Sequence, residues 1–571
     1  MNNETGHTDL QSHFPTGTEG LSETIPPRSS VNSLLSDNSA VCLNLNREAL
    51  IQQIIHRNEA FVSRQGFLFT HTPAESTGRS PGDTYIVKDP NNEKLIAWDS
   101  ANNHPLEREI FEGLWQDALS ELEQRSQIYV TERVIGAESK FALPVKTITD
   151  NALTALFTLN MFRPIPHNIK NSILADEPFT LLVLPGCMID TKRYQGRLRR
   201  LADGKTSQMA IIMDFKNRLG LVYGSSYGGS VKKLMFTAMN YYLPLVDVLP
   251  LHCSSNENKN RELALFLGLS GTGKTSLSTN PDRALLGDDE HGWSDRGIAN
   301  FENGCYAKLI DLNPVKEPEI FNAVFHEDRP TRHGAIVENA MIFSDGCFNL
   351  SDDRLTPNSR ASYPLSFLSN YKQSSVGPHP KTIIFLTADA NGVLPPISRL
   401  GRDQALLWFL MGYTSKLAGT EAGVINPVSI FSRFFGEPFM PLLPEMYLDL
   451  LSRKLNEHQT ATFLINTGWV GGPFGVGHRI DIDLTRRMVN AALDGKLEDV
   501  DYAGDSLFHL QVPKTCPGIP HDLLIPERIW SDSLLYEKRA RSLAEEFSRH
   551  FDKTYGKSQI SERIMRQCPG K

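Results

Sequence analysis

A glycine-rich stretch near the middle of the chain has the pattern of a phosphate-binding loop. It comprises Gly268, Leu269, Ser270, Gly271, Thr272, Gly273, Lys274, Thr275 and Ser276, and Gly268 to Thr275 match G-x-x-x-x-G-K-[ST] in full. Glycines let successive backbone N–H groups turn toward one anion, Lys274 adds a positive charge, and Thr275 offers a hydroxyl to Mg²⁺. The pattern predicts a bound nucleoside triphosphate.

The residues on both sides of this loop favour the same interpretation. An apolar run, Leu263–Leu267, precedes it, and Ser276 could open a helix, as the pattern requires. The alternatives are a glycine-rich turn without a ligand and a dinucleotide-binding loop. The dinucleotide fingerprint is not met, because Ser276 stands where a third glycine is needed.

An acidic cluster follows a second apolar run, Ala284–Leu286. It reads Gly-Asp-Asp-Glu-His over 287–291, which places carboxylates at the end of a predicted strand, where the metal that accompanies phosphate is usually held. An isolated acidic cluster is more often a solvated turn. Beside a phosphate loop, we favour metal binding by Asp288 or Asp289, directly or through water.

Basic residues in three other segments could complete such a site. Lys232 and Lys233 are adjacent at the start of a predicted helix, and such pairs are commonly solvated. In a cleft with a divalent cation, repulsion would lower the pKa of one ammonium and leave a neutral amine as a ligand. His252 alone is more often a buried histidine than a ligand. Arg79 could bind a carboxylate with two parallel hydrogen bonds.

Alternating strand-like and helical patterns must position these residues. Strands are predicted at Thr180–Leu184, Ala210–Met213, Leu221–Tyr223, Leu263–Leu267, Ala284–Leu286, Ala340–Phe343, Thr382–Leu386 and Ala461–Ile465. Helices are predicted from Asn46 onward, over Val231–Tyr242, over Arg402–Lys416, and at the end of the chain, where Tyr536, Ala540, Leu543, Phe547 and Phe551 form one apolar stripe. These patterns predict a mixed α/β protein.

Length and composition divide the chain into three parts. The 571 residues are too many for one compact core. Residues 1–40 are rich in Ser, Thr, Asn, Gly and Pro without a period, which predicts a disordered polar tail. An α/β domain is expected over 41–250 and a nucleotide-binding domain over 251–571, with the boundary near 245–260.

Charge and cysteine content exclude several classes of protein. The chain has 58 basic and 66 acidic residues, which gives a net charge of −8. Nucleic acid is therefore not expected as a partner. Seven scattered cysteines without a C-x-x-C pair predict neither a disulfide framework nor a zinc knuckle and favour a cytoplasmic location. The start lacks a targeting pattern, and no apolar stretch reaches the roughly 18 residues that span a bilayer, so we expect no membrane anchor.

Several motifs, taken in order, resemble those of the ATP-dependent phosphoenolpyruvate carboxykinases. The main ones are T-G-R-S-P at 77–81, Y-G-G-x-x-K-K at 227–233, H-C-S at 252–254, G-L-S-G-T-G-K-T at 268–275 and G-D-D-E-H-G-W at 287–293. Others are C-Y-A-K at 305–308, E-P-E-I at 317–320, R-x-S-Y-P at 360–364, G-V-L-P-P at 392–396, G-Y-T-x-K-x-A-G-T-E at 412–421 and N-T-G-W at 466–469. The resemblance covers about residues 45–550.

The resemblance implies both a fold and a reaction. In the family, an N-terminal α/β domain and a C-terminal P-loop domain with a lid flank a cleft. Oxaloacetate is decarboxylated, and the ATP γ-phosphoryl group is captured as phosphoenolpyruvate, with release of CO₂ and ADP, in gluconeogenesis. The enolate oxygen left by decarboxylation must be stabilised by a metal or by cations before it attacks phosphorus in line.

The resemblance also assigns roles to residues. It implies that the Mn²⁺ ligands are Lys233, His252 and Asp289, and that Thr275 binds the Mg²⁺ that accompanies ATP. The implied substrate contacts are Arg79, Tyr227, Lys233 and Arg360. The implied catalytic cations are Lys232, Lys233, Lys274, Lys308 and Arg360. Besides the phosphate loop, the implied nucleotide contacts are Glu317, Arg360, Arg479, Ile480 and Thr485.

Five positions depart from the family pattern. They are Gly82 for a lysine, Asn303 for a glycine, Asn391 for an aromatic residue in the segment that resembles the lid, Phe434 for a cysteine and His478 for a lysine. None of them removes a chemical group named above.

Two other functions compete with this interpretation. Another P-loop kinase for small molecules would share Lys274 and Thr275 but would not need Lys233, His252 and Asp289 together. An inactive nucleotide-binding regulator would have lost a metal ligand or a phosphate-binding cation, and the sequence keeps them all.

Overall fold

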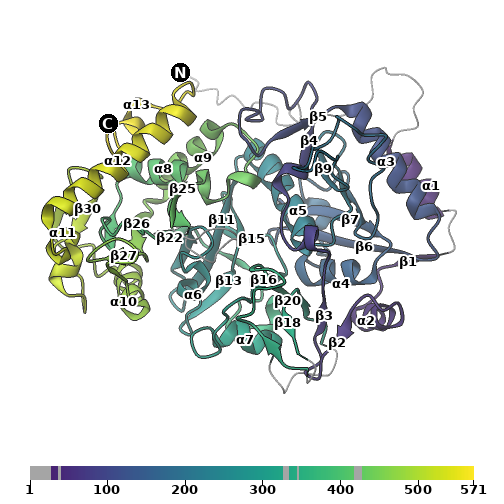
Figure 1. Ribbon diagram of the computed structural model, residues 1–571, viewed down its shortest axis with the longest axis horizontal. Helices are drawn as coiled ribbons and strands as arrows, with labels where there is room; N and C mark the ends of the chain where they lie inside the picture. The colour runs from purple at the N-terminus through teal and green to yellow at the C-terminus, as the bar shows by residue number, and fades with distance from the viewer. Residues whose placement is uncertain (1–26, 37–39, 326–332, 344–345, 417–426) are drawn as a thin grey trace, which may run out of the picture.

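The computed structural model describes residues 27–36, 40–325, 333–343, 346–416 and 427–571. Strands and helices alternate along this length and form three larger sheets with helices packed around them (Figure 1). The prediction of a mixed α/β protein is therefore confirmed. Among the helices in these ranges, none combines the length and apolarity needed to cross a bilayer.

The first sheet has eight strands from the early part of the chain. Their spatial order is β1 (Val41–Leu43), β6 (Ile128–Ile135), β7 (Leu143–Thr149), β8 (Phe179–Leu184), β10 (Leu219–Tyr223), β9 (Ala210–Asp214), β4 (Thr84–Val87) and β5 (His104–Leu106). Strands β8, β9 and β10 are buried along their whole length, so their sequences are continuously apolar rather than alternating. All three were predicted and are confirmed.

Helices cover both faces of this sheet. On one face, α3 (Arg108–Glu123) packs its apolar stripe against the strands. On the other lie α2 (Arg47–His56), α4 (Ala152–Met161) and α5 (Gly228–Tyr242). Because α5 also faces the centre of the molecule (Figure 1), it connects the first sheet with the residues described below.

Helix α1 (Pro27–Ser36) corrects the prediction of a disordered tail over residues 1–40. It packs beside α3, and its Val31 and Leu34 keep only 3% and 5% of their surface exposed. The tail prediction is therefore wrong for this helix, while residues 1–26 and 37–39 lie outside the described residues. The sequence pattern of this helix consists of two apolar side chains one turn apart, which is too short to predict a helix.

The second sheet is made of eleven later strands. Ten follow the order β21 (Val376–Gly377), β15 (Ile298–Asn300), β14 (Glu290–Trp293), β11 (Leu249–Asn258), β12 (Leu263–Leu267), β22 (Pro380–Thr387), β26 (Ala461–Asn466), β23 (Ile397–Arg399), β30 (Gln511–Pro513) and β29 (Tyr502–Gly504), and β13 (Arg283–Gly287) also pairs with β11. The central strands β12, β22 and β26 are parallel. The strand predictions at 263–267, 284–286, 382–386 and 461–465 are confirmed.

A third sheet combines strands from distant parts of the sequence. Its order is β16 (Gly304–Lys308), β20 (Arg360–Pro364), β17 (Ile336–Glu338), β3 (Leu68–Thr70) and β2 (Phe61–Val62). Strand β3 thus pairs with β17, which follows residue 300, and β2 pairs with β3 at the edge of the sheet. The expected boundary near 245–260 does not separate the strands of this sheet.

Two element predictions need correction. The helix expected over Arg402–Lys416 ends earlier, as α8 (Arg402–Met411), because Gly412 adopts a left-handed conformation with φ 53°. The following residues form β24 (Tyr413–Lys416), paired with β25 (Val428–Phe431). The strand expected at Ala340–Phe343 is only β18 (Met341–Ile342), paired with β19 (Phe348–Asn349).

The remaining elements complete the second half of the chain. They are α6 (Lys274–Ser278), α7 (Pro318–Phe325), α9 (Pro444–His458), β27 (Trp469–Val470), β28 (His478–Arg479), α10 (Ile482–Leu493), α11 (Pro526–Ile529), α12 (Ser533–Tyr555) and α13 (Glu562–Met565). Helix α12 is the predicted closing helix, and it buries Ala540, Leu543, Phe547 and Phe551 of the expected stripe. All seven cysteines are free thiols, as expected.

Candidate active site

Four nitrogen-bearing side chains converge on the carboxylate of Asp289. Its Oδ1 lies 2.8 Å from Nζ of Lys274 and 2.9 Å from Nε2 of His252. Its Oδ2 lies 2.7 Å from Nζ of Lys233 and 2.9 Å from Nζ of Lys232. The structure thus brings together, at one carboxylate, residues from four separate sequence motifs.

The pairing of β11 explains this convergence. Strands β13 and β14 both run antiparallel to β11, and Asp289 lies in the turn between them. His252 is on β11, directly opposite Glu290 of β14. The phosphate loop leaves β12, the other neighbour of β11, and delivers Lys274 as the first residue of α6. The two adjacent lysines come from the first turns of α5.

The backbone of the phosphate loop requires its glycines. Gly271 and Gly273 have φ values of 87° and 89°, a region that favours glycine. A Cβ at Gly268 would lie 2.5 Å from Oγ1 of Thr272. The strand–loop–helix context predicted from the sequence is therefore present, with Thr275 beside Lys274 on α6.

Charge is strongly coupled within this cluster. Burial alone would raise the pKa of Asp289, but Lys232, Lys233 and Lys274 outweigh it and hold that pKa well below its usual range. Burial alone would likewise lower the pKa of Lys232, but the surrounding carboxylates raise it well above the ordinary value. Asp289 is therefore an anion at neutral pH, and Lys232 is a cation.

His252 is held in a neutral form suited to accept a cation. Burial, followed by the charge of Lys274, lowers the pKa of His252 to about 4. Its Nδ1 lies against the backbone carbonyl of Phe435, so this nitrogen carries the proton and donates it. The Nε2 lone pair then faces Oδ1 of Asp289 at 2.9 Å, and the ammonium of Lys274 lies near both acceptors, 3.3 Å from Nε2 and 2.8 Å from Oδ1.

Two buried glutamates belong to the cluster and were missed by sequence reasoning. Glu290 lies 2.8 Å from Nζ of Lys233, and Glu302 lies 3.1 Å from Nζ of Lys232. Ligand atoms of Asp289, Glu290 and Glu302 all lie within 4.8 Å of one another. Glu290 stood inside the acidic motif and could have been included, whereas no pattern marked Glu302.

This donor set fits a divalent cation. Neutral imidazole, carboxylate and amine groups meet at Asp289, and His252 and Asp289 present facing lone pairs there. Imidazole and carboxylate are ordinary ligands for first-row divalent metals. Thr275 does not join this cluster and instead lines a separate cavity between α6, α7 and α10.

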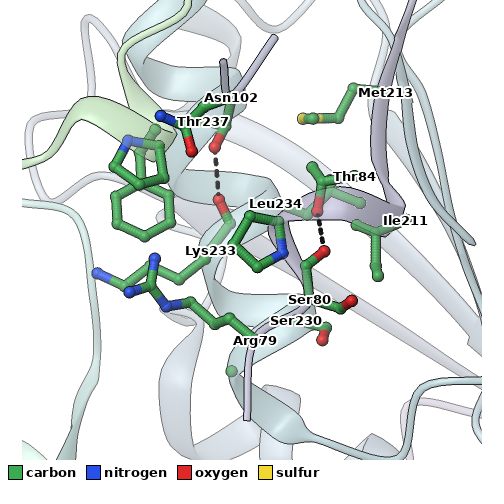
Figure 2. A pocket seen from close by; sticks show the side chains of 14 residues that line it. Arg79, Ser80, Thr84, Asn102, Ile211, Met213, Ser230, Lys233, Leu234 and Thr237 are labelled. Carbon is green, nitrogen blue, oxygen red and sulfur yellow. Dashed lines mark hydrogen bonds between the residues drawn. The ribbon is translucent and has the colours of Figure 1, made fainter. Parts of the chain in front are cut away.

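Arg79 and Lys233 line a small cavity next to the cluster. Figure 2 shows their side chains running alongside each other toward the same region. Each lies against the ring of Phe439, with Cζ of Arg79 at 4.8 Å and Nζ of Lys233 at 4.7 Å from the ring centroid. The cavity measures about 40 Å³, and the solvent-accessible guanidinium of Arg79 is free to bind a carboxylate.

One side-chain amide connects three segments of the expected substrate site. Oδ1 of Asn358 accepts hydrogen bonds from Nε and Nη2 of Arg360, at 3.0 and 2.9 Å. Its Nδ2 donates to the carbonyl of Thr77 at 3.0 Å and to the hydroxyl of Tyr227 at 3.3 Å. No sequence motif marked Asn358, because two of its partners, Thr77 and Tyr227, are distant along the chain.

Lys308 lies directly opposite Arg360 in the β16–β20 pair. Burial, and then the nearby charge of Arg360, lower the pKa of Lys308 below the usual lysine value. Two cations therefore share one face of the third sheet, where they could bind an anionic group.

Of the expected nucleoside residues, Glu317 lines a larger cavity of about 410 Å³, whereas Arg479, Ile480 and Thr485 are not among the residues that line it. Oε1 of Glu317 accepts a hydrogen bond from Ser276 at 3.0 Å, and Nη2 of Arg479 donates to the carbonyl of Gly271 at 3.0 Å. Ile480 and Thr485 are buried beside them, and the hydroxyl of Thr485 donates to the backbone of α10. A cavity of this size is in the range of small-ligand sites.

The structure shows which side chain lies next to Gly82, one of the five departures from the family pattern. A Cβ at Gly82 would lie 3.0 Å from Cδ of Arg199, whose guanidinium pairs with Asp83 at 2.9 Å. The arginine side chain therefore fills the space beside the position where the pattern has lysine. Phe434 is fully buried with φ 61°, and His478 is exposed on β28.

Comparisons with known proteins identify one family of relatives. Residues 39–522 match the family model described as phosphoenolpyruvate carboxykinase. A protein of Caldanaerobacter subterraneus subsp. tengcongensis named phosphoenolpyruvate carboxykinase (ATP) is 42% identical over 92% of this chain and 96% of its own. Proteins of the same name from Geobacillus kaustophilus and Bacillus subtilis are 44% and 42% identical, over 88% and 89% of this chain and 92% and 93% of theirs.

Proposed function

The chain belongs to the family of ATP-dependent phosphoenolpyruvate carboxykinases, and we propose that it converts oxaloacetate and ATP to phosphoenolpyruvate, ADP and CO₂. As a member of this family it is a carboxy-lyase that binds ATP and a divalent metal, and its role is in gluconeogenesis. The observation that carries the proposal is the meeting of Lys232, Lys233, His252 and Lys274 at Asp289. A kinase acting on a simple hydroxyl would not need this set.

The three sheets support an assignment of substrate binding and nucleotide binding to two different domains. We assign residues 41–250 to a substrate-binding domain around the first sheet and residues 251–571 to a nucleotide-binding domain with the P-loop and a lid. Strands β2 and β3 extend the first segment into the third sheet, where β17 lies between β3 and the strand that carries Arg360. The two segments therefore share the substrate end of the site.

Mn²⁺ and Mg²⁺ are the divalent cations that we propose. Lys233, His252 and Asp289 would hold Mn²⁺, with Lys233 as a free amine, and the hydroxyl of Thr275 would hold the Mg²⁺ that accompanies ATP. These ions supply positive charge beside a developing enolate oxygen and beside the transferred phosphoryl group.

Substrate binding and decarboxylation are assigned to the cations near Phe439 and Tyr306. Arg79 and Tyr227 would hold oxaloacetate, with Arg79 gripping a carboxylate through two parallel hydrogen bonds. The bond to the departing carboxylate breaks, CO₂ leaves, and the electron pair becomes the enolate. Because Lys232 remains a cation, it would stabilise the enolate oxygen without giving up its proton.

Phosphoryl transfer follows from the phosphate loop. The enolate oxygen attacks the γ-phosphorus in line, and the bond to ADP breaks. Lys274, Lys308 and Arg360 would neutralise the charge that spreads over the transferred group. We assign the nucleoside contacts to Glu317, which lines the cavity beside the loop, to Arg479, which bonds to the carbonyl of Gly271, and to Ile480 and Thr485.

A carboxylation assay tests this function. Phosphoenolpyruvate, ADP and labelled bicarbonate should yield labelled oxaloacetate, trapped by reduction with malate dehydrogenase and NADH. We expect the highest rate with Mn²⁺ and Mg²⁺ together, and a lower rate with either alone. A protein that phosphorylates hydroxyl compounds from ATP but never incorporates labelled CO₂ would instead be another P-loop kinase, and a protein that binds ATP without either reaction would be a regulator.

A further inference from the structure

Glu338 is a buried carboxyl group beside the substrate site for which no role has been given above. It ends strand β17 and keeps only 5% of its surface exposed. It lies directly opposite Arg360 in the β17–β20 pair, and Arg360 lies directly opposite Lys308 in the β16–β20 pair. Because directly paired residues share a face of a sheet, an acid and two cations form one row across three strands.

One oxygen of Glu338 serves the start of helix α5. The helix begins at Gly228, and neither its N-cap Tyr227 nor its first turn supplies an acidic or capping side chain. Oε1 of Glu338, from another strand, instead lies at this helix start, and the backbone amide of Gly228 acts to lower the pKa of the Glu338 carboxyl group. A carboxylate at a helix N-terminus satisfies a free N–H group and offsets the positive end of the helix dipole.

Glycine at position 228 is what permits this contact. A Cβ there would lie 2.8 Å from Oε1 of Glu338 and 2.7 Å from Cε2 of Phe157. Any larger residue would push the helix start away from the strand. Glycine in the Y-G-G-x-x-K-K motif is therefore required for steric reasons. The close approach at Gly228 fixes the start of α5 and, with it, the position of the two lysines on the helix.

The other oxygen of Glu338 accepts a hydrogen bond from the Tyr306 hydroxyl. The Tyr306 ring lies between two residues assigned to the substrate, with its centroid 5.7 Å from that of the Tyr227 ring and 5.7 Å from Cζ of Arg360. Phe157 packs on the same ring at 5.4 Å. Fixing the Tyr306 hydroxyl therefore fixes the surface against which Tyr227 and Arg360 rest.

We propose that Glu338 is a positioning residue that caps α5 from β17 and holds the Tyr306 ring, so that Tyr227 and Arg360 are presented to oxaloacetate. The identity of the substrate rests on the proposed function. Glu338 acts through these neighbours and touches no reacting atom. Its loss should weaken use of oxaloacetate while the phosphate loop, which it does not contact, still binds ATP.

The titration of Glu338 predicts a pH dependence of the KM for oxaloacetate. A purely structural role would not produce this dependence. Burial raises its pKa to about 7, although the Tyr306 hydroxyl, the Gly228 amide and the charge of Arg360 all act to lower it. Thr70 lies directly opposite it on β3, and Phe157 from α4 lies with it at Gly228. Below that pH the group becomes neutral, so the KM for oxaloacetate should rise as pH falls from 8 to 6, in addition to any pH effect shared by the variants.

The experiment compares Glu338→Gln with Glu59→Gln as a matched control. Glu59 also caps a helix from outside, because its Oε2 accepts the N–H of Leu153 in α4 at 2.8 Å. Helix α4 carries none of the residues assigned to substrate, nucleotide or metal. For each variant, the KM and kcat with oxaloacetate are measured from pH 6 to 8, together with Tm and with ATP affinity from intrinsic tryptophan fluorescence.

We expect Glu338→Gln to raise the KM for oxaloacetate by about tenfold or more and to remove the added pH dependence. ATP affinity should stay within about twofold of wild type. Glu59→Gln should lower Tm and leave the KM unchanged. Tyr306→Phe keeps the ring and removes only the hydroxyl, and it should also raise the KM for oxaloacetate. This variant tests the proposal if Glu338→Gln does not fold.

Two results would overturn the proposal. One is an unchanged KM and pH profile in a folded Glu338→Gln or Tyr306→Phe variant. The other is a parallel loss of ATP affinity, KM and Tm, which would make Glu338 a structural residue only. Wild-type protein in the same assay reports separately on the proposed function, because absent turnover there would reject the reaction itself.

Discussion

The ammonium of Lys274 lies 2.8 Å from Oδ1 of Asp289. The phosphate loop and the acidic motif, which the sequence separates, therefore meet in one ion pair inside the site. Phosphate oxygens and this carboxylate compete for the same lysine, so binding of the nucleotide and the charge at Asp289 are coupled.

Changes in the phosphate loop should impair catalysis without unfolding the protein. Lys274→Ala or Thr275→Ala removes a group that faces ligand rather than core, and losing such charge stabilisation costs on the order of 10²-fold in kcat. Tm should remain close to wild type. Lys381→Ala, which breaks only the surface pair with Glu262, is the matched control and should keep full activity. Near-native kcat in a folded Lys274→Ala variant would remove this lysine from the mechanism.

Lys233→Arg should weaken Mn²⁺ binding and abolish most turnover. Arginine keeps a positive charge but has no lone pair to offer, whereas the amine of Lys233 can bind a metal once it is deprotonated. Mn²⁺ affinity should therefore fall as pH falls, and ATP should still bind at Gly268–Thr275. Electron paramagnetic resonance titration of Mn²⁺ measures this directly. Wild-type Mn²⁺ affinity in the variant would leave His252, Asp289 and water as the metal site.

ATP should support much faster turnover of oxaloacetate than GTP. Glu317 lines the cavity next to the phosphate loop, and Arg479 donates a hydrogen bond to the Gly271 carbonyl of that loop. Together with Thr485, these are the nucleoside residues that the resemblance to ATP-dependent enzymes implies. The measurement is kcat/KM for each nucleotide under identical metal concentrations. Equal or greater kcat/KM with GTP contradicts the prediction.

Helix α1 should contribute to stability, whereas residues 1–26 should not. Deleting residues 1–26 removes a polar segment and should leave Tm and activity unchanged. Deleting residues 1–36 also exposes the surface that Val31 and Leu34 cover, and Tm should fall by about 2–4 °C. The double substitution of Val31 and Leu34 by serine should reproduce that fall. Identical Tm values for both deletions would show that α1 adds no stability.

His550 should make the protein less stable as pH falls. Burial, and then the charge of Lys553, lower its pKa to about 4, and its ring stacks on Phe431 with centroids 4.4 Å apart. The unfolded chain binds a proton at the ordinary histidine pKa of about 6.5 and the folded protein does not. The free energy of unfolding therefore decreases below pH 6.5, toward pH 4. Denaturant unfolding of His550→Gln should show a weaker decrease over this range, and an unchanged pH dependence contradicts the assignment.

The sequence by itself determined those features that are local in the chain. The phosphate loop between β12 and α6 is set by closely spaced glycines, a lysine and an apolar run, and each acts on its neighbours. The buried strands β8, β9 and β10 were visible because residues covered on both faces are continuously apolar. The family was visible because five motifs occur in order. Two local predictions were wrong. The apolar pattern of α1 was too short to predict a helix, and the helix predicted over Arg402–Lys416 ends at the left-handed Gly412.

Only the tertiary structure decided which distant residues meet. Glu302, Glu338 and Asn358 carry no motif, and each acquires its role from partners on other strands or helices. The pairing of β3 with β17 also joins two segments that the sequence predicts to belong to different domains. Periodicity reports whether a residue faces the core or solvent, but it does not report which other buried residue lies opposite. That choice depends on sheet register and helix packing, so the chemistry of a buried carboxyl group is settled only when the whole chain has folded.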